Sequence, residues 1–347
     1  MTTFLERVQV EIPLIQAGMA GGITTPDLVA AVANNGALGT IGAGYMSPQT
    51  LKEEIQQVKS LTDKPFAVNL FAQNMERFST DIENMQGFLD KFREELEIDS
   101  GSSHVKINDY LHEKIRIVIK ENIPIVSTAF GILSSLSIER LKNNNVTLIG
   151  MATNLEEAKQ LEEAGYDVVV AQGFEAGGHR GTFNVIEYPN GANIGIMVLV
   201  QEFLENLSVP VIAAGGISES GQINALLHMG AAGVQLGTKF LIAQEAGTNE
   251  AYRRTLIKAH AEDTIITKVF SGRPARAIKN RFIKEVEDSR INLLPFPIQN
   301  ELTKDIRAAG KKFSKPDFQS LWAGQGVGAI RKEETVKEMI DSLFDKN

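Results

Sequence analysis

Short runs of hydrophobic residues recur along most of the chain, and each follows a stretch with helical periodicity. The runs are rich in valine and isoleucine and do not alternate with polar residues, which is typical of strands buried on both faces of a parallel sheet. Eight runs predict eight strands: PLIQAG from Pro13, GALGTIG from Gly36, PFAVNLF from Pro65, IPIVSTA from Ile123, VTLIGMA from Val146, DVVVAQG from Asp167, PVIAAGG from Pro210 and GVQLGT from Gly233.

The segments between these strands have the pattern of amphipathic helices. TNLEEAKQLEEAGY begins with a capping residue, Thr153 or Asn154, and SESGQINALLHMGAAG begins with Ser218. The two segments end at Gly165 and Gly230. Repeated alternation of strand and helix predicts an α/β protein. The count of eight favours a (β/α)8 TIM barrel, and an open doubly wound sheet is the alternative.

The regular spacing is interrupted twice, after the third and after the sixth predicted strand. Residues 74–121 contain two charged helical segments, and we interpret them as an insertion, either an elaborated connection or a lid over a site. Helical patterns continue after the eighth strand. We therefore expect a TIM barrel in residues 1–245 and a C-terminal helical cap, residues 246–347, packed on the barrel.

Composition narrows the possible functions. Of the 347 residues, 43% are hydrophobic and 22% are charged, as in a globular protein with a large core. The net charge of -8 disfavours nucleic acid and anionic membranes as partners, because phosphate binding needs clustered positive charge. The lack of cysteine excludes disulfides and thiol nucleophiles. The N-terminal segment has the features of neither a secretion signal nor a membrane span, so we expect a cytoplasmic protein that acts on small molecules.

Glycine-rich turns follow the seventh and eighth predicted strands. The seventh ends in AAGGIS, with Gly215 and Gly216, and the eighth ends in QLGTKF, with Gly237 and Thr238. TIM barrels often bind phosphate at these two turns, where backbone N–H groups and a helix N-terminus can hold an anion without lysine. Tight turns alone could need the same glycines, but two in succession favour a phosphate site.

Three amide side chains are expected at the same edge of the barrel, namely Gln16, Asn69 and Gln172. Amides both donate and accept hydrogen bonds, as the polar edge of a flavin ring requires. Buried amides are costly unless they are paired. These side chains therefore either bind a ligand or brace the loops of the barrel.

His179 lies in AQGFEAGGHRG, just beyond the sixth strand, and is surrounded by Gly177, Gly178 and Gly181. The glycines allow a loop that carries the imidazole over the barrel mouth. An ordinary pKa near neutrality makes this histidine the candidate general acid or base, and a surface-loop histidine is the alternative. No pair of histidines has the spacing of a zinc site, so no metal is expected.

A basic run, with Arg273, Arg276, Lys279 and Arg281, lies in the C-terminal part of the chain. Runs of positive charge usually lie on a solvated face of a helix, and we favour that interpretation. An anion-binding group is the alternative.

At these residues the sequence resembles the nitronate monooxygenase family, formerly called 2-nitropropane dioxygenases. The resemblance covers nearly the whole chain. It rests on PLIQAGMAGGITTPDLVAAVANNGALGTIGAG, PFAVNLF, AQGFEAGGHRGTF, PVIAAGGI, GVQLGTKF, SGRPAR and the late WAGQG. Flavin-dependent enoyl-acyl-carrier-protein reductases share the glycine–histidine segment, whereas AGMAGG and WAGQG favour the nitronate branch.

The resemblance implies a barrel that binds FMN without a covalent link or a metal. It implies oxidation of an alkyl nitronate by molecular oxygen to a carbonyl compound and nitrite. His179 would take the α-proton of a neutral nitroalkane or, as imidazolium, hold the nitronate. An NAD(P)H-dependent flavin reductase of an enoyl thioester or a quinone is the alternative, and a binding protein without activity is a third. The implied flavin contacts are Asn69, Gln172, Gly177, Gly216, Gln235, Leu236, Gly237 and Thr238.

Overall fold

Eight parallel strands form the centre of the computed structural model, which describes residues 3–73, 81–105, 107 and 110–344. All eight predicted strands are confirmed. They are β1 (Leu14–Gln16), β2 (Thr40–Gly42), β3 (Ala67–Phe71), β4 (Ile125–Ala129), β5 (Thr147–Ala152), β6 (Val168–Gln172), β8 (Val211–Ala214) and β9 (Gly233–Leu236).

The order of the strands distinguishes a barrel from an open sheet. They pair as β1-β9-β8-β6-β5-β4-β3-β2. A parallel bridge between Ile15 and Leu38 brings the segment before β2 beside β1, so the sheet nearly closes on itself. This order confirms the (β/α)8 TIM barrel and excludes the doubly wound alternative.

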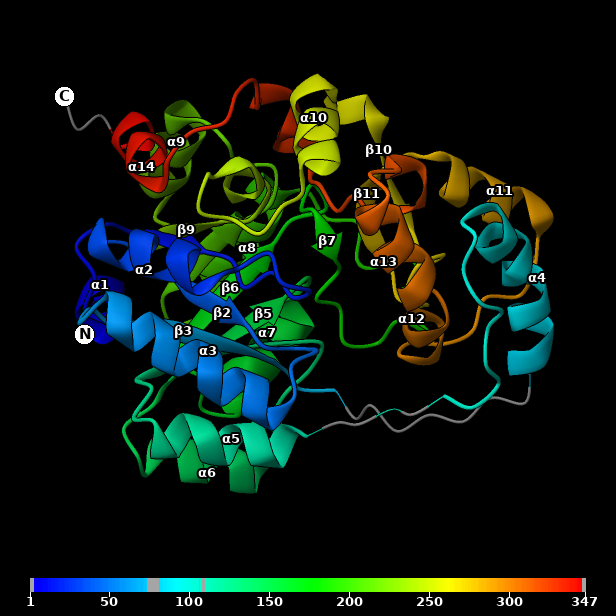
Figure 1. Ribbon diagram of the computed structural model, residues 1–347. Coiled ribbons are helices and arrows are strands. Elements are labelled where there is room, and N and C mark those ends of the chain that lie inside the picture. Colours follow the sequence, from blue (N-terminus) through cyan, green and yellow to red (C-terminus); the bar gives the residue numbers. More distant parts are fainter. Residues whose placement is uncertain (1–2, 74–80, 106, 108–109, 345–347) are drawn as a thin grey trace.

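A ring of helices covers the outside of the barrel (Figure 1). In α7 the cap is Asn154, whose side chain accepts a hydrogen bond from Glu157 N–H, whereas α9 is capped by Glu219, one residue later than expected. The last helix, α14, closes the ring between α2 and α9. The ring consists of α2 (Pro26–Asn34), α3 (Pro48–Leu61), α5 (Leu111–Lys120), α6 (Ser135–Lys142), α7 (Leu155–Glu163), α8 (Ile196–Asn206), α9 (Ser220–Met229) and α14 (Val336–Leu343).

Apolar side chains fill the barrel from within and from without. Ile125, Ile149 and Ile212 belong to an inner core that also includes Phe4 and Val8 of the short helix α1 (Phe4–Val8). A larger core lies between the strands and the ring of helices. Because α1 lies at the amino-terminal end of the barrel, the carboxyl ends of the strands are left to form the site.

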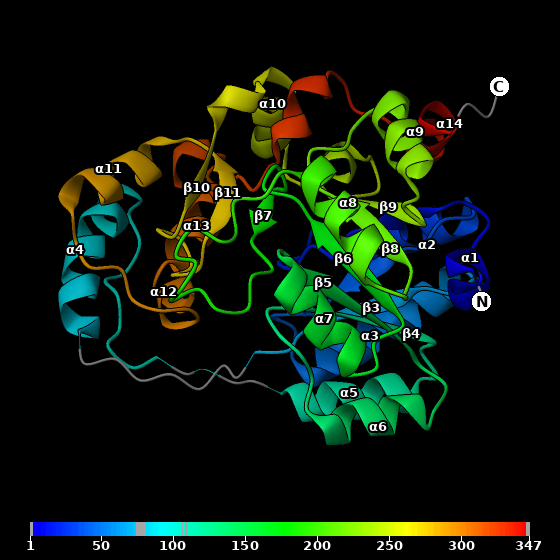
Figure 2. The same ribbon diagram turned by 180° about the vertical axis from the view of Figure 1, so that it is seen from behind.

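A second group of elements lies over the carboxyl ends of the barrel strands (Figures 1 and 2). Its apolar core joins Leu89 and Phe92 of α4 with Phe270, Phe282 and Phe318. The elements of this group are α4 (Ile82–Glu95), β10 (Thr264–Thr267), β11 (Ala275–Ile278), α11 (Arg281–Ser289), α12 (Ile298–Leu302), α13 (Lys304–Lys312) and η3 (Pro316–Phe318). The elements η1 (Thr238–Ile242), α10 (Glu250–Lys258) and η4 (Gln325–Ala329) contribute side chains to the larger barrel core, and η2 (Ala261–Asp263) contacts η4.

The expected insertion, residues 74–121, contributes to both parts of the molecule. Its helix α4 packs in the second group of elements, whereas α5 packs between α3 and α6 in the ring around the barrel. Residues 74–80, 106 and 108–109 lie outside the described residues. The division of the chain at residue 245 and the lid interpretation stay predictions.

A helical cap was expected in the C-terminal part, but this part also contains strands. Strands β10 and β11 form an antiparallel sheet with β7 (Gly178–His179), in which Ala275 pairs with His179. Strands of four residues are too short to show a clear period of two, so helical patterns on either side dominate the sequence. This small sheet joins the C-terminal part to the segment that carries the histidine.

Candidate active site

A cavity of about 620 Å³ lies between the carboxyl ends of the barrel strands and the helices α12 and α13. Its size is that of a pocket for a cofactor or small substrate. His179 and all of the flavin contacts implied by the resemblance line this cavity, although they come from separate strand ends. They are Asn69, Gln172, Gly177, His179, Gly216, Gln235, Leu236, Gly237 and Thr238.

The glycine turn after β8 packs tightly against the late WAGQG segment. Gly215 and Gly216 have φ angles of 123° and 69°, which residues with a Cβ rarely adopt. A Cβ on Gly326 would lie 2.5 Å from the Gly216 carbonyl oxygen. Thr238 Oγ1 accepts a hydrogen bond from Gly324 N–H at 2.9 Å. Close backbone approach therefore requires these glycines, and the WAGQG segment forms part of the site.

Two of the three amides brace loops. Gln172 lines the cavity, donates to the His179 carbonyl at 3.1 Å and accepts from Gly181 N–H at 2.8 Å. Gln16 is fully buried, does not line the cavity, and accepts from Thr40 N–H at 3.0 Å. The expectation that Gln16 reaches the mouth of the barrel is therefore wrong, because its amide is used to join neighbouring strand ends.

His179 is held in a strand instead of a flexible loop. Its backbone pairs with Ala275 of β11, and its Nε2 atom lies 2.8 Å from Ser271 Oγ. The Ser271 hydroxyl donates to the Arg273 carbonyl at 3.1 Å. Strand pairing and the serine contact together fix the direction of the imidazole. The sequence could not show these partners, since they lie far along the chain.

Aromatic rings surround the imidazole of His179. The ring centres of Trp322, Phe130 and Phe296 lie 5.2, 5.8 and 6.0 Å from that of the histidine. The guanidinium of Arg273 lies 4.0 Å above the Phe130 ring. The histidine therefore has an apolar wall that limits its contact with water.

This environment changes the protonation of His179. Burial, together with the charges of Arg273 and Arg307, lowers the pKa of its imidazole to about 3. The cause is that a cation loses its hydration here and is repelled by two neighbouring cations. Near neutral pH the imidazole is therefore neutral, and the imidazolium role is disfavoured.

The basic run does not form a solvated helix face. Arg273 and Arg276 are only 1% and 3% exposed. Arg276 donates to the Phe174 carbonyl at 2.9 Å, and Arg273 donates to Gln73 Oε1 at 2.7 Å. Neither arginine lines the cavity, so the anion-binding alternative does not describe them either. Arg281 alone of this group begins a helix, α11, and it forms an ion pair at the surface.

Charged side chains missed by the sequence interpretation also line the cavity, and most are basic. The sequence of α13 does not show which face of this helix is turned toward the barrel, so its charged residues could not be assigned to the site. The charged residues at the cavity, apart from His179, are Lys114, Glu301, Lys304, Arg307 and Lys311.

In the described part of the chain, no three acidic or histidine side chains are grouped to hold a metal ion. None of the helices in that part has the length and apolar character of a membrane span.

The family model that matches this chain and two of its relatives have the same description. The family model described as nitronate monooxygenase matches residues 2–346. A probable nitronate monooxygenase of Staphylococcus haemolyticus (strain JCSC1435) is 39% identical over 342 residues, which cover 98% of this chain and 95% of the relative. Another, from Staphylococcus aureus (strain Newman), is 44% identical over 324 residues, with 92% and 90% covered.

One similar solved structure has a description related to that of the family, and another has a different name. The nitroalkane oxidase from Streptomyces ansochromogenes has a TM-score of 0.90 and 34% identity, with 97% of this chain and 96% of that chain covered. FabK from Thermotoga maritima has a TM-score of 0.78 and 26% identity, with 99% and 96% covered. The expected family is thus confirmed: the chain belongs to the nitronate monooxygenase family of flavin-dependent oxidoreductases.

Proposed function

We propose that the protein binds FMN in this cavity and oxidises alkyl nitronates with molecular oxygen, giving a carbonyl compound and nitrite. The main support for this proposal is that His179 and all the expected flavin contacts line one cavity. Membership of a flavoenzyme family supports the class of reaction. Bound FMN would accept electrons from the nitronate and pass them to oxygen.

The cavity wall fits a flavin mononucleotide. A Cβ on Gly237 would meet only the side chains of Ala17 and Met19, at 3.6 and 3.8 Å, and both residues line the cavity. The Gly237 backbone therefore faces open space that a phosphate can approach. Asn69 donates to Ser127 Oγ at 2.9 Å, which holds its amide at the cavity wall. Residues 216 and 237 would hold the phosphate, and Asn69 would contact the ring.

His179 is the proposed proton acceptor for neutral nitroalkanes. A hydroxyl has one proton, and Ser271 donates it to the Arg273 carbonyl, so the 2.8 Å contact places a proton on His179 Nε2. Nδ1 is then the atom that accepts the α-proton. The low pKa makes the imidazole a weak base in the free enzyme. A substrate that is already a nitronate needs no such step, which favours the nitronate as the preferred form.

The decisive experiment is anaerobic mixing of the purified yellow protein with a nitronate or with NADH, followed by flavin absorbance. Rapid bleaching by ethylnitronate and none by NADH supports the proposal. Rapid bleaching by NADH instead supports the flavin reductase, which the shared glycine–histidine segment keeps as the second candidate. Mass analysis of the chromophore released by heat identifies FMN; release of FAD contradicts the cofactor assignment.

A further inference from the structure

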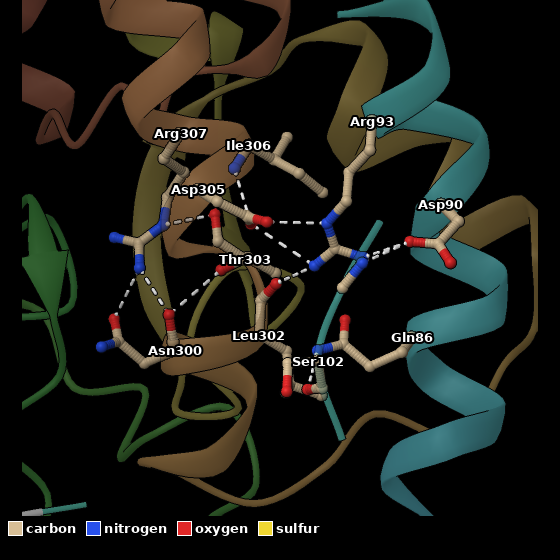
Figure 3. Close-up of polar contacts among 11 residues, drawn as sticks. Gln86, Asp90, Arg93, Ser102, Asn300, Leu302, Thr303, Asp305, Ile306 and Arg307 are labelled. Atoms are coloured by element: carbon tan, nitrogen blue, oxygen red, sulfur yellow. Dashed lines mark hydrogen bonds and ion pairs between the residues drawn. The ribbon is translucent and has the colours of Figure 1, made fainter. Parts of the chain in front are cut away.

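Arg307 projects from α13 toward the barrel. In Figure 3 its guanidinium lies on the side of the helix opposite Asp305, whose carboxylate turns toward Arg93 of α4. Arg307 lines the cavity, as does Asn300 one turn before α13. The face of α13 with Asp305 therefore contacts α4, and the face with Arg307 contributes to the site.

Within the described part of the chain, none of the hydrogen bonds of Arg307 is made to a carboxylate. The guanidinium donates to the carbonyl and side-chain oxygens of Asn300 at 2.7 and 3.0 Å and to the Thr303 carbonyl at 3.3 Å. All three acceptors are neutral, and the bonds use Nε and Nη2. Among the described residues, no carboxylate oxygen lies within 4.0 Å of this guanidinium. Lys304, by contrast, forms an ion pair with Glu301 at 3.3 Å.

Arg307 is partly buried at the cavity wall, and its Nη1 atom makes none of these three bonds. A cation in such a place is stabilised by an anion that binds directly to it. Loss of hydration lowers the pKa of Arg307, which the charges of Glu301 and Asp305 partly oppose. The charge of Arg307 in turn contributes to the lowered pKa of His179. An anion bound between the two side chains would relieve both effects. The glycine turns proposed for the FMN phosphate follow strands of the barrel, whereas Arg307 belongs to α13, so we assign the anion at Arg307 to the substrate.

We propose that Arg307 binds the anionic reacting group of the substrate and thereby selects nitronates over neutral nitroalkanes. The inference rests on the proposed function for the identity of the anion. A guanidinium suits this task because the two oxygens of a nitronate, like those of a carboxylate, form a planar anion that its N–H groups match. The chemical class recognised is therefore a small planar oxyanion with a short alkyl group.

Inert ligands of matched shape test the anion site without turnover. Isobutyrate has the shape of propyl-2-nitronate and carries its charge, whereas isobutyramide has the shape without the charge. Calorimetric titration of the purified holoenzyme should show tighter binding of isobutyrate. In Arg307→Met, isobutyrate binding should weaken roughly 10- to 100-fold, the usual effect of losing a charge-assisted hydrogen bond, while isobutyramide binding stays the same.

Lys312→Met is the matched control, because Lys312 is an exposed cation of α13 that does not line the cavity. It should bind isobutyrate like wild type. If the wild-type protein binds isobutyrate and isobutyramide equally tightly, the inference is overturned. It is also overturned if Arg307→Met binds isobutyrate as tightly as wild type. If nitronate is not oxidised but Arg307-dependent isobutyrate binding persists, the proposed function fails and the anion site stands. Arg307→Gln, with flavin content checked, replaces the methionine variant if that one does not fold.

Discussion

His179 is a neutral group in an apolar, cationic setting, and this determines the pH range in which it works. Burial and the charges of Arg273 and Arg307 lower its pKa to about 3. The neutral, proton-accepting form therefore persists as pH falls from 8 to 5. An unperturbed histidine, by contrast, would lose that form below about pH 6.5.

The pH dependence of kcat/KM on a neutral nitroalkane follows from this pKa. The profile should show no decrease near pH 6.5 attributable to histidine, because kcat/KM reports ionisations of the free enzyme. Steady-state rates between pH 5 and 8 measure it. A tenfold loss per pH unit below 6.5 that disappears in His179→Asn would contradict the lowered pKa.

Replacing His179 with asparagine separates its two possible roles. Asparagine keeps hydrogen-bonding capacity but accepts no proton near neutral pH, so turnover of neutral nitroalkane should fall by roughly 100-fold or more. Oxidation of preformed nitronate should fall less, since no proton is removed. Rates on both substrate forms, with flavin content measured by absorbance, give the comparison. Equal losses on both forms would show that His179 binds the substrate and is not its base.

At the scale of elements, α4 and α13 are joined by a buried guanidinium (Figure 3). Arg93 is 1% exposed and donates to Asp305 at 2.7 Å, to Asp90 at 2.8 Å and to the Leu302 carbonyl at 2.7 Å. These bonds fix the helix that carries Arg307 on its other face. Helix α4, which lies in the segment inserted after β3, therefore helps to hold α13 at the cavity wall.

Arg93→Met should lower the free energy of unfolding by about 2 kcal/mol, the scale of hydrogen bonds to charged groups. Methionine retains much of the apolar volume, and Asp90 and Asp305 can be hydrated, so the loss should not be larger. Urea denaturation measures it. The KM for nitronate should also rise, because α13 is held less firmly, while kcat changes less.

Lys91→Met is the control for this variant. Lys91 is on the same helix, but its ion pair with Glu285 spans 3.5 Å and its side chain is 48% exposed. An exposed pair of this kind contributes little, and the Lys91 amine also lies 4.6 and 4.5 Å from the ring centres of Phe88 and Phe92, so stability should change by no more than about 1 kcal/mol. Equal destabilisation by the two substitutions would show that the buried guanidinium has no special part in joining the helices.

The strands of the barrel could be predicted from sequence because each is a continuous apolar run, buried on both faces. The two-residue strand at His179 and the strands β10 and β11 could not, since their pairing joins segments far apart in the chain. The cavity residues at strand ends were predictable for a similar reason: in a barrel, every strand ends at the same rim. Arg307 was not, because its position depends on how α13 packs against α4.

At the scale of the whole molecule, the cavity lies between the barrel and the group of elements that contains α4, α11 and α13. The barrel core and the core that contains α4, α11 and α13 are separate clusters. Barrel residues such as Gly237 and second-group residues such as Arg307 and Trp322 line the same cavity. A ligand bound there contacts both parts, and it should therefore stabilise them together.

FMN should accordingly raise the thermal stability of the whole protein. At 100 times its dissociation constant, a ligand that binds only the folded state adds about 2.7 kcal/mol, which corresponds to a midpoint higher by roughly 4 °C. Calorimetric scans of flavin-depleted protein at increasing FMN concentration measure the effect. A midpoint that does not depend on FMN would contradict binding in this cavity.

Gly237→Val is the variant that tests where FMN binds. Gly237 has a φ of -114°, and a Cβ there meets Ala17 and Met19 at ordinary contact distances, so the flavin-depleted variant should unfold like flavin-depleted wild type. Gly216→Val is a poorer choice, because its φ is 69° and its Cβ would lie 2.9 Å from Glu175 Cβ. The valine at 237 projects into the cavity where the phosphate is expected, and the rise in midpoint with FMN should disappear. If FMN raises the midpoint of this variant as much as that of wild type, the phosphate does not bind at this turn.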